Sequence, residues 1–233
     1  MLAVIDPRMP TKAKQNLNKI CETVELPPFS ALDERVASHP DMLVFSAHGK
    51  LFTCKGYYAE AKVAIDKIIS HAGLELVLTD DVLASEYPYD VKFNLFAFNG
   101  GFVGNLPYVS EEIKRYLESK KIPCLSVKQG YTKCSSVVLD NAVISADKGI
   151  CDAVTSLGGD ALKISSGGVL LSGYSEGFLG GASGVYEKTV FFCGDIQKHQ
   201  DYDRIYEFCS ACGYETVSLS DEPLYDVGTI FFF

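Results

Sequence analysis

The stretch LVFSAHGKLFTCKGYYAEAKVAIDKIISHAGLELVL, residues 43–78, predicts a β-hairpin, a helix and a third strand. Two short apolar segments flank a turn at residues 48–50. Residues 57–72 carry apolar side chains at helical spacing and end at Gly73, and the apolar strand 74–78 follows. The stretch is therefore one strand–strand–helix–strand unit, written ββαβ below.

The same order of elements returns along the chain, at intervals of about 50, 43, 44 and 46 residues. The last copy has only its first strand before the chain ends, and residues 1–30 supply the strand, helix and strand that it lacks. The predicted units are 41–80, 90–128, 131–166, 177–220, and 1–30 together with 224–233. The other hairpins are expected to begin with strands 93–98, 134–139, 180–185 and 226–233, the first of these turning at 99–101. The other helices are expected at 12–21, 110–117, 147–157 and 201–212, with Ser110 and Asp147 as N-caps.

A unit of this size cannot bury its own apolar face, so neighbouring units must stack on it. Closing the row of units through the two termini also removes exposed sheet edges. We therefore expect an α/β fold, a five-bladed pseudo-symmetric α/β-propeller of ββαβ units in a single domain, residues 1–233. The alternative is an open α/β sandwich whose loop lengths happen to match.

Composition excludes several classes of protein. The 233 residues are 47% hydrophobic and 22% charged, enough for a buried core, and the formal net charge is −9. No basic cluster is longer than Lys120-Lys121, which argues against nucleic acid and anionic membranes as partners. The sequence shows no signal peptide and no apolar run of membrane-spanning length, and its eight cysteines are irregularly spaced. We expect a cytoplasmic protein with reduced thiols, as a monomer or homodimer.

Three other patterns do not support a site. Residues 173–177 match G-x-S-x-G, but the glycine-rich segment after them is a poor helix former. Residues 167–184 match neither glycine-rich phosphate-binding motif. Cys209 and Cys212 have no second pair at zinc-ligand spacing, and acids near His199 fit a helix N-terminus better than a metal site. We expect no metal and no cofactor.

The segments YPYDVKFN (87–94), QGYTKCS (129–135) and SDEPLYDVG (220–228) resemble an uncharacterised bacterial family of the pentein, or guanidino-group-modifying enzyme, fold. The superfamily contains deiminases, dimethylaminohydrolases and amidinotransferases, and also a non-enzymatic ribosome anti-association factor. The resemblance implies a catalytic cysteine in the last unit and a histidine at the head of the preceding hairpin. Residues 225–229 and 178–183 contain neither, so the chain departs from the catalytic pattern.

Candidate site residues lie at or just before the first strands of the units, which should face a central channel. Cys134 is the candidate nucleophile, and Lys133 or His199 would handle protons. Cys134 could equally be a small core residue, and single polar side chains at strand ends are ordinarily caps or surface charges. The candidate substrate-binding residues are Asp41, Asp90, Lys92, Asn94 and Asp226.

Two functional hypotheses follow. In the first, the chain is a hydrolase or transferase that performs C–N bond chemistry of the amidinohydrolase or amidinotransferase kind, on a guanidino, amidino or amine-bearing substrate. In the second, it is a non-catalytic module that binds a ligand or a protein on the same scaffold. Both predict a small polar ligand in the channel, and the carboxylates among the candidates are compatible with a cationic one.

Overall fold

The computed structural model describes residues 1–99 and 101–233, and it contains five three-stranded sheets built to one pattern. In each sheet an antiparallel hairpin is followed by a parallel third strand. The sheets are β3 (Phe45–Ala47), β4 (Lys50–Cys54) and β5 (Glu75–Thr79); β6 (Phe96–Phe98), β7 (Gly101–Gly104) and β8 (Cys124–Ser126); β9 (Ser136–Val138), β10 (Ala142–Ser145) and β11 (Asp160–Lys163); β13 (Ser183–Tyr186), β14 (Thr189–Phe192) and β15 (Glu215–Ser218); and β17 (Phe231–Phe232), β1 (Leu2–Ile5) and β2 (Glu22–Glu25). A two-stranded sheet joins β12 (Val169–Leu170) to β16 (Leu224–Tyr225).

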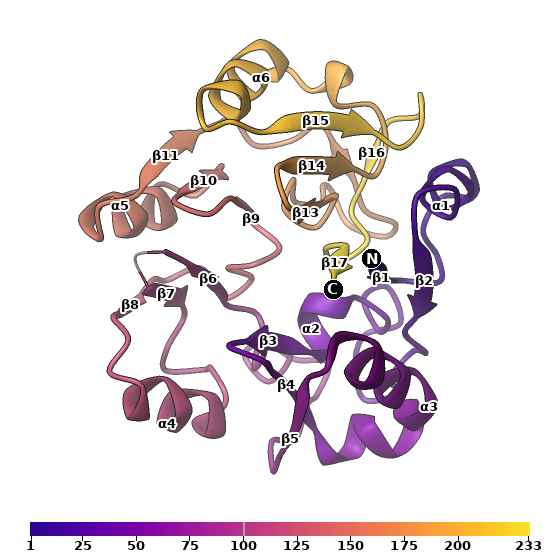
Figure 1. Ribbon diagram of the computed structural model, residues 1–233, viewed down its shortest axis with the longest axis vertical. Helices are drawn as coiled ribbons and strands as arrows, with labels where there is room; N and C mark the ends of the chain where they lie inside the picture. Colours follow the sequence, from indigo (N-terminus) through magenta and orange to yellow (C-terminus); the bar gives the residue numbers. More distant parts are fainter. Residues whose placement is uncertain (100) are drawn as a thin grey trace.

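One helix connects the second and third strands of each sheet and lies on the outside of the molecule. The first strand of each sheet lies nearest the centre (Figure 1). The predicted α/β class is confirmed. The turn predicted at 99–101 includes Gly100, which lies outside the described residues. No helix in the described part of the chain is long and apolar enough to cross a bilayer. The connecting helices are α1 (Thr11–Leu17), α3 (Lys55–Ala72), α4 (Glu111–Ser119), α5 (Lys148–Ser156) and α6 (Tyr202–Ala211).

Helix boundaries follow local chemistry. Gly73 ends α3 in the left-handed conformation, at φ 63°, as its lack of a side chain allows. The Asp147 side chain accepts a hydrogen bond from the Ile150 N–H at 2.9 Å, which confirms it as the cap of α5. Ser110 precedes α4 as expected, but its hydroxyl turns to Glu112 and caps no backbone N–H. The predicted helix 12–21 is shorter, because the chain leaves the helix after Leu17.

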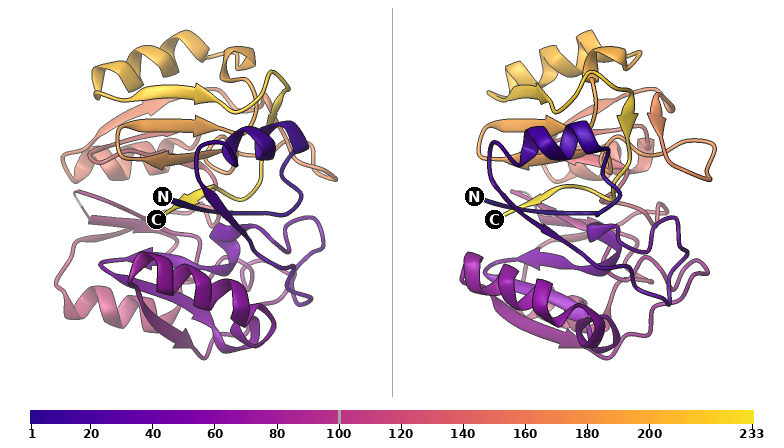
Figure 2. Two further views of the ribbon diagram at one scale, coloured as in Figure 1. Left: turned by 45° about the vertical axis from the view of Figure 1, so that its right-hand side comes forward. Right: turned by 90° about the vertical axis from the view of Figure 1, so that its right-hand side faces the viewer.

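The two termini complete one sheet together. The N–H of Leu2 donates to the carbonyl of Phe233, and the N–H of Phe233 donates to the carbonyl of Leu2, both at 2.8 Å. Strand β17 pairs antiparallel with β1, which pairs parallel with β2. Figure 2 shows the two ends side by side in both views.

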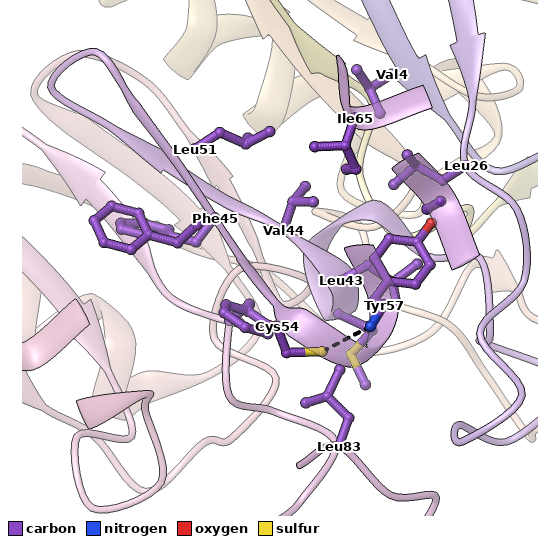
Figure 3. Close-up of a cluster of buried hydrophobic side chains, with 14 of the residues drawn as sticks. Val4, Leu26, Leu43, Val44, Phe45, Leu51, Cys54, Tyr57, Ile65 and Leu83 are labelled. Atoms are coloured by element: carbon purple, nitrogen blue, oxygen red, sulfur yellow. Dashed lines mark hydrogen bonds between the residues drawn. The ribbon is translucent and has the colours of Figure 1, made fainter. Parts of the chain in front are cut away.

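The largest part of the core lies between α3 and the strands beneath it (Figure 3). Tyr57 is fully buried there, and its hydroxyl donates to the carbonyl of Pro27 at 2.9 Å, so its one polar atom is satisfied. Its N–H donates to the sulfur of Cys54 at 3.4 Å. All eight cysteines are free thiols. The short helix α2 (Pro40–Leu43) directly precedes β3, and all four of its residues are buried.

Most inner strands begin later than the sequence predicts, because a helical turn precedes the strand. The Ser135 N–H donates to the Tyr131 carbonyl at 2.9 Å, and the Ala182 N–H donates to the Phe178 carbonyl at 3.0 Å. The helix α2 is the same feature ahead of β3, where the Val44 N–H bonds to Pro40. Strand β9 therefore starts at Ser136, and the predicted strands 93–98, 134–139, 180–185 and 226–233 are too long at their starts. The candidates Asp41, Asn94 and Cys134 lie in or beside these turns rather than on strands.

Candidate functional site

Four polar side chains from separate units meet in what we call the polar layer: Asp41, Asn94, Cys134 and Thr229. The Cys134 thiol donates to Asp41 Oδ2, with Sγ and Oδ2 2.9 Å apart. The Thr229 hydroxyl donates to the same oxygen at 2.8 Å. Asn94 Nδ2 donates to Cys134 Sγ at 3.3 Å. Three predicted site residues, up to 93 positions apart in the chain, are therefore in direct contact.

Asn94 also holds the turn that presents the thiol. Its Oδ1 accepts the backbone N–H groups of Lys133 at 2.7 Å and Cys134 at 3.3 Å. Its Nδ2 donates to the carbonyl of Asp41 at 3.2 Å as well as to the sulfur. The amide thus uses both ends to fix the relative position of Asp41 and Cys134.

The surroundings of the polar layer disfavour the ionised forms of Asp41 and Cys134. Asp41 Oδ1 is buried and has no hydrogen-bond partner among the described residues. Burial raises the pKa of Asp41, although its bonds from Cys134 and Thr229 oppose the shift. Burial raises the pKa of the Cys134 thiol well above its ordinary value, and the charges of Asp41 and Asp226 raise it further. The thiol is therefore protonated in the unliganded protein.

A cavity of about 170 Å³, called the central cavity below, opens against the thiol. Tyr131, Tyr174 and Phe178 form aromatic walls, and the Tyr131 and Phe178 rings lie 6.1 Å apart at a 30° tilt. Within the described part of the chain, no lysine or arginine borders it. Its lining is Val36, His39, Met42, Tyr131, Cys134, Leu171, Tyr174, Glu176, Phe178 and Asp226.

Asp226 forms an acidic wall of the central cavity, and Glu176 is the other acidic residue in the lining. It accepts the N–H groups of Phe178 at 2.8 Å and Gly228 at 2.9 Å. Burial is the main effect that raises the pKa of Asp226 to about 6. A side chain on Gly181 would place its Cβ 2.0 Å from Asp226 Oδ1, so this glycine makes room for the carboxylate. The small residues that the sequence places in the inner turns therefore have a packing reason.

His39 stands between two carboxylates at the edge of the central cavity. Its Nδ1 lies 3.9 Å from Asp226 Oδ1, and its Nε2 lies 3.8 Å from Asp6 Oδ2, too far for a direct hydrogen bond. Burial lowers the pKa of His39, against the opposing effect of both acids. The imidazole is therefore predominantly neutral near pH 7, with a ring nitrogen able to take a proton.

Asp90 supports the aromatic wall rather than lining the cavity. The Tyr131 hydroxyl donates to Asp90 Oδ2 at 2.7 Å, whereas Oδ1 is buried and unpartnered in the described structure. Burial raises the pKa of Asp90. The carboxylate thus orients the ring of Tyr131.

The remaining predicted residues do not join the group. Lys133 Nζ lies 3.5 Å from the carbonyl of Ser136, and its side chain lines a different cavity. His199 lines a separate cavity of about 40 Å³ and accepts the Asp201 N–H through Nδ1. Lys92 lies over the ring of Tyr89. The hydrogen bonds of the described residues connect neither Lys133 Nζ nor His199 to the Cys134 thiol.

Sequence reasoning missed His39, Thr229, Tyr174 and Phe178. His39 directly precedes Pro40 and Asp41, so its position next to a candidate acid in the repeated turn was an available signal. No group of three or more histidine, cysteine or acidic side chains is placed to hold a metal ion in residues 1–99 and 101–233.

Comparison with known proteins gives the fold and the family. None of the curated proteins matches the sequence. Among solved structures, the chain is similar to dimethylarginine dimethylaminohydrolase from Pseudomonas aeruginosa in complex with citrulline, with a TM-score of 0.57, 11% identity and coverage of 94% of this chain and 92% of that one.

Two further structures share the fold. The amidinotransferase SxtG from Microseira wollei has a TM-score of 0.54 and 12% identity, over 92% of this chain and 76% of that one. Agmatine deiminase from C. jejuni has a TM-score of 0.53 and 10% identity, over 94% and 87%. All three have the pentein fold of guanidino-modifying enzymes, which confirms the predicted resemblance. Residues 4–231 match the model of one sequence family, and the chain belongs to that family, which is a family of unknown function (DUF6873).

Proposed function

We propose that the protein is a hydrolase or transferase of small guanidino or amidino compounds, with Cys134 as its nucleophile. The observation that carries this proposal is the central cavity, where a thiol, a buried carboxylate and aromatic walls meet without a lysine or arginine among the described residues. The named activities of the fold relatives, a dimethylaminohydrolase, an amidinotransferase and a deiminase, support the same substrate class.

The cavity favours a planar cation. Asp226 supplies negative charge in its wall, and the buried Asp41, with its unpartnered Oδ1, adds charge next to the Cys134 thiol. Faces of aromatic rings attract cations, most strongly when water is excluded. A guanidinium or amidinium head between Tyr131, Phe178 and Asp226 would satisfy groups that have no positive partner in the free protein.

The bound cation also activates the nucleophile. Burial is the main cause that raises the pKa of the Cys134 thiol in the free protein, and the charges of Asp41 and Asp226 add to it; the charge of the bound cation offsets this second effect. The thiol proton then passes to Asp41 Oδ2, which already accepts it at 2.9 Å, and the thiolate attacks the central carbon of the substrate.

The chemical step balances within this set of residues. A C–S bond forms as the carbon becomes tetrahedral, and Asp41 returns the proton to the leaving nitrogen as the C–N bond breaks. An amidino group remains on Cys134 and an amine departs. Water in the hydrolase, or an acceptor amine in the transferase, then attacks this carbon and gives a proton to neutral His39. The C–S bond breaks, and the proton held by His39 returns to the released thiolate.

The same proposal includes a closed ring of five units in one domain. The shared pattern of the five sheets, contacts of β9 with β6 and β13, and the contact between β13 and β17 support it. The pairing of both termini in one sheet supports closure. In such a ring the repeated turns bring the polar layer to the axis.

A non-catalytic binding module is the second candidate, and one observation favours it. The Cys134 thiol is buried, donates to Asp41 and has a raised pKa, which describes a resting structural cysteine as well as an unoccupied nucleophile. Both candidates require the cation site, so the thiol chemistry separates them.

We expect chloroacetamidine, whose amidinium mimics the substrate, to alkylate Cys134 at least about tenfold faster than iodoacetamide does at about pH 7.5. The amidinium occupies the central cavity and lowers the thiol pKa, whereas neutral iodoacetamide leaves it raised. Peptide mass spectrometry of each cysteine against time and pH measures both rates, and agmatine should slow the amidine reaction by competition.

Cys193 is the matched control, because it is buried and Asp226 helps to raise its pKa, yet it does not border the central cavity. Equal chloroacetamidine rates at Cys134 and Cys193 would exclude Cys134 as the nucleophile. Agmatine binding without any Cys134 adduct, and without amine release from a panel of guanidino compounds, would establish the binding module instead.

Cation binding should also depend on pH. Asp226 has a pKa raised to about 6, so it is mostly ionised at pH 7 and mostly neutral at pH 5. Agmatine stays a cation over this range, and its affinity should fall about tenfold between these pH values. Calorimetric titration of the Cys134→Ser variant, which avoids turnover, measures this change. A constant affinity would mean that Asp226 does not contact the cation.

A further inference from the structure

Lys133 points into a second cavity of about 200 Å³, called the apolar cavity below, which has no lining residue in common with the central cavity. Thr229 of the polar layer borders the apolar cavity, whereas Cys134 borders the central one. The polar layer therefore lies between the two spaces. The lining comes from the inner strand of every unit or residues directly beside it: Phe45, Ser46, Leu95, Phe96, Ala97, Lys133, Val138, Val185, Thr229, Ile230, Phe231 and Phe232.

Lys133 is the one charged residue in that lining within the described chain. Its ammonium group forms no ion pair with any described residue, and its hydrogen bond to the Ser136 carbonyl is long, at 3.5 Å. Phe231 offers it only a ring face, with the centroid 6.0 Å from Nζ. An ammonium group has three donors, so most of its hydrogen-bonding capacity has no partner among the described protein groups.

Such a site is unfavourable for the charged amine when empty. Burial lowers the pKa of Lys133, against the attraction of the nearby Asp41 and Cys134. An anion in the cavity would supply the missing partner and restore the ordinary pKa, because opposite charges stabilise each other most where water is excluded. Nine hydrophobic side chains around the lysine would bury the rest of the ligand.

We propose that the apolar cavity is a second binding site, which takes a small monocarboxylate with an apolar body. The carboxylate pairs with Lys133 Nζ, and the hydrocarbon part packs on Phe96, Val185 and Phe231. A space of about 200 Å³ accommodates a short acyl chain. The two sites differ in the charge of the ligand that they favour, since the acidic central cavity attracts cations and Lys133 attracts anions.

Hexanoate and its neutral analogue hexanamide test the charge recognition. We expect hexanoate to bind with a Kd below about 1 mM at about pH 7, at least tenfold more tightly than hexanamide. Lys133→Met should remove this preference and weaken hexanoate at least tenfold, while agmatine affinity at the central cavity changes by less than about threefold. Calorimetry measures each affinity. Lys92→Met, a lysine in the corresponding turn before β6, is the control and should bind hexanoate as the unmodified chain does.

A second measurement needs no substitution at Lys133. After reductive methylation with ¹³C-formaldehyde, which keeps the charge, the dimethyl resonance of Lys133 should shift with hexanoate and not with hexanamide. Equal binding of the two probes, unchanged hexanoate affinity in Lys133→Met, or absence of binding at about 10 mM hexanoate would each overturn the proposal. Because agmatine reports on the other cavity, these outcomes leave the proposed guanidino chemistry untouched.

Discussion

A chain that lacks Phe231, Phe232 and Phe233 should lose its folded state at room temperature. These residues are β17 and the end of the chain, and β17 is the antiparallel partner of β1. The Phe232 ring packs 5.1 Å from that of Phe191 and 5.9 Å from that of Tyr186. The deletion also removes both backbone bonds between Leu2 and the last residue.

The expected loss is comparable to the whole stability of the protein. Three half-buried phenylalanines contribute roughly 1–2 kcal/mol each through apolar burial, and the unpaired edge of β1 adds further cost. A domain of ordinary stability has about 5–15 kcal/mol to lose. Circular dichroism and thermal melting of the deletion variant measure the outcome.

Tyr206→Ala is the control for the loss of an aromatic side chain, because Tyr206 is 51% exposed on α6 and lies outside the sheet of β17, β1 and β2. It should melt within a few degrees of the full chain. A deletion variant that also melts within a few degrees would show that the C-terminus does not hold the fold together, and the closed ring would have to be abandoned.

The repeated units were predictable because they are local. Each hairpin and helix shows its own periodicity of apolar residues within fewer than 40 residues. The split sheet could be predicted because the two ends of the chain carry complementary pieces of the same unit. The inner turns were not predictable in the same way. One helical turn is too short to show a period, so residues such as Cys134 were expected on strands.

That difference changes the assignment of neighbours. On a strand, Lys133 and Cys134 would point to opposite faces; in a helical turn, successive side chains diverge by about 100°. Either geometry separates the two side chains, and they line different cavities in the structure. The cause is the helical turn and not the alternation of a strand. His39 was missed because its meaning depends on Asp226, which lies 187 positions further on and meets it only in the folded chain.

The polar layer has the features of a site maintained at some loss of stability. Buried polar groups in proteins are nearly always paired, yet Asp41 Oδ1 and, beside the aromatic wall, Asp90 Oδ1 have no partner in the described structure. A core that served stability alone would place apolar side chains there. Binding energy from a cation would recover what these carboxylates lose in the empty protein.

Asp41→Asn should therefore stabilise the protein while it abolishes cation binding. Asp41 is fully buried, and burial raises its pKa above the unfolded value of about 3.9. A carboxyl whose pKa is higher in the folded state than in the unfolded state binds its proton more tightly when the protein is folded. Its contribution to stability is therefore fully present at a pH below the unfolded pKa, and it is lost as the pH rises through the folded pKa. Asparagine keeps an oxygen for the Thr229 hydroxyl and the Cys134 thiol, and carries no charge.

The gain should be about 1–3 kcal/mol at about pH 8 and should shrink toward pH 5, where the native carboxyl is increasingly protonated. Urea unfolding of both chains across this range measures it. Agmatine affinity, measured in the Cys134→Ser background, should fall at least about 100-fold because the site loses the negative charge of Asp41, whose Oδ2 lies 2.9 Å from Cys134 Sγ in the native chain. Asp147→Asn, which keeps the cap of α5, should change neither the pH profile nor the affinity.

The two readouts separate the possible roles of Asp41. A variant that is less stable than the native chain by the same amount at every pH would show a structural carboxylate, held by its bonds from Thr229 and Cys134. A variant with unchanged agmatine affinity would remove Asp41 from the cation site and leave Asp226 and Glu176 as the acidic residues of the cavity. Higher stability together with lost binding is the combination that only a ligand-directed carboxylate produces, because the charge then opposes folding and serves the bound state.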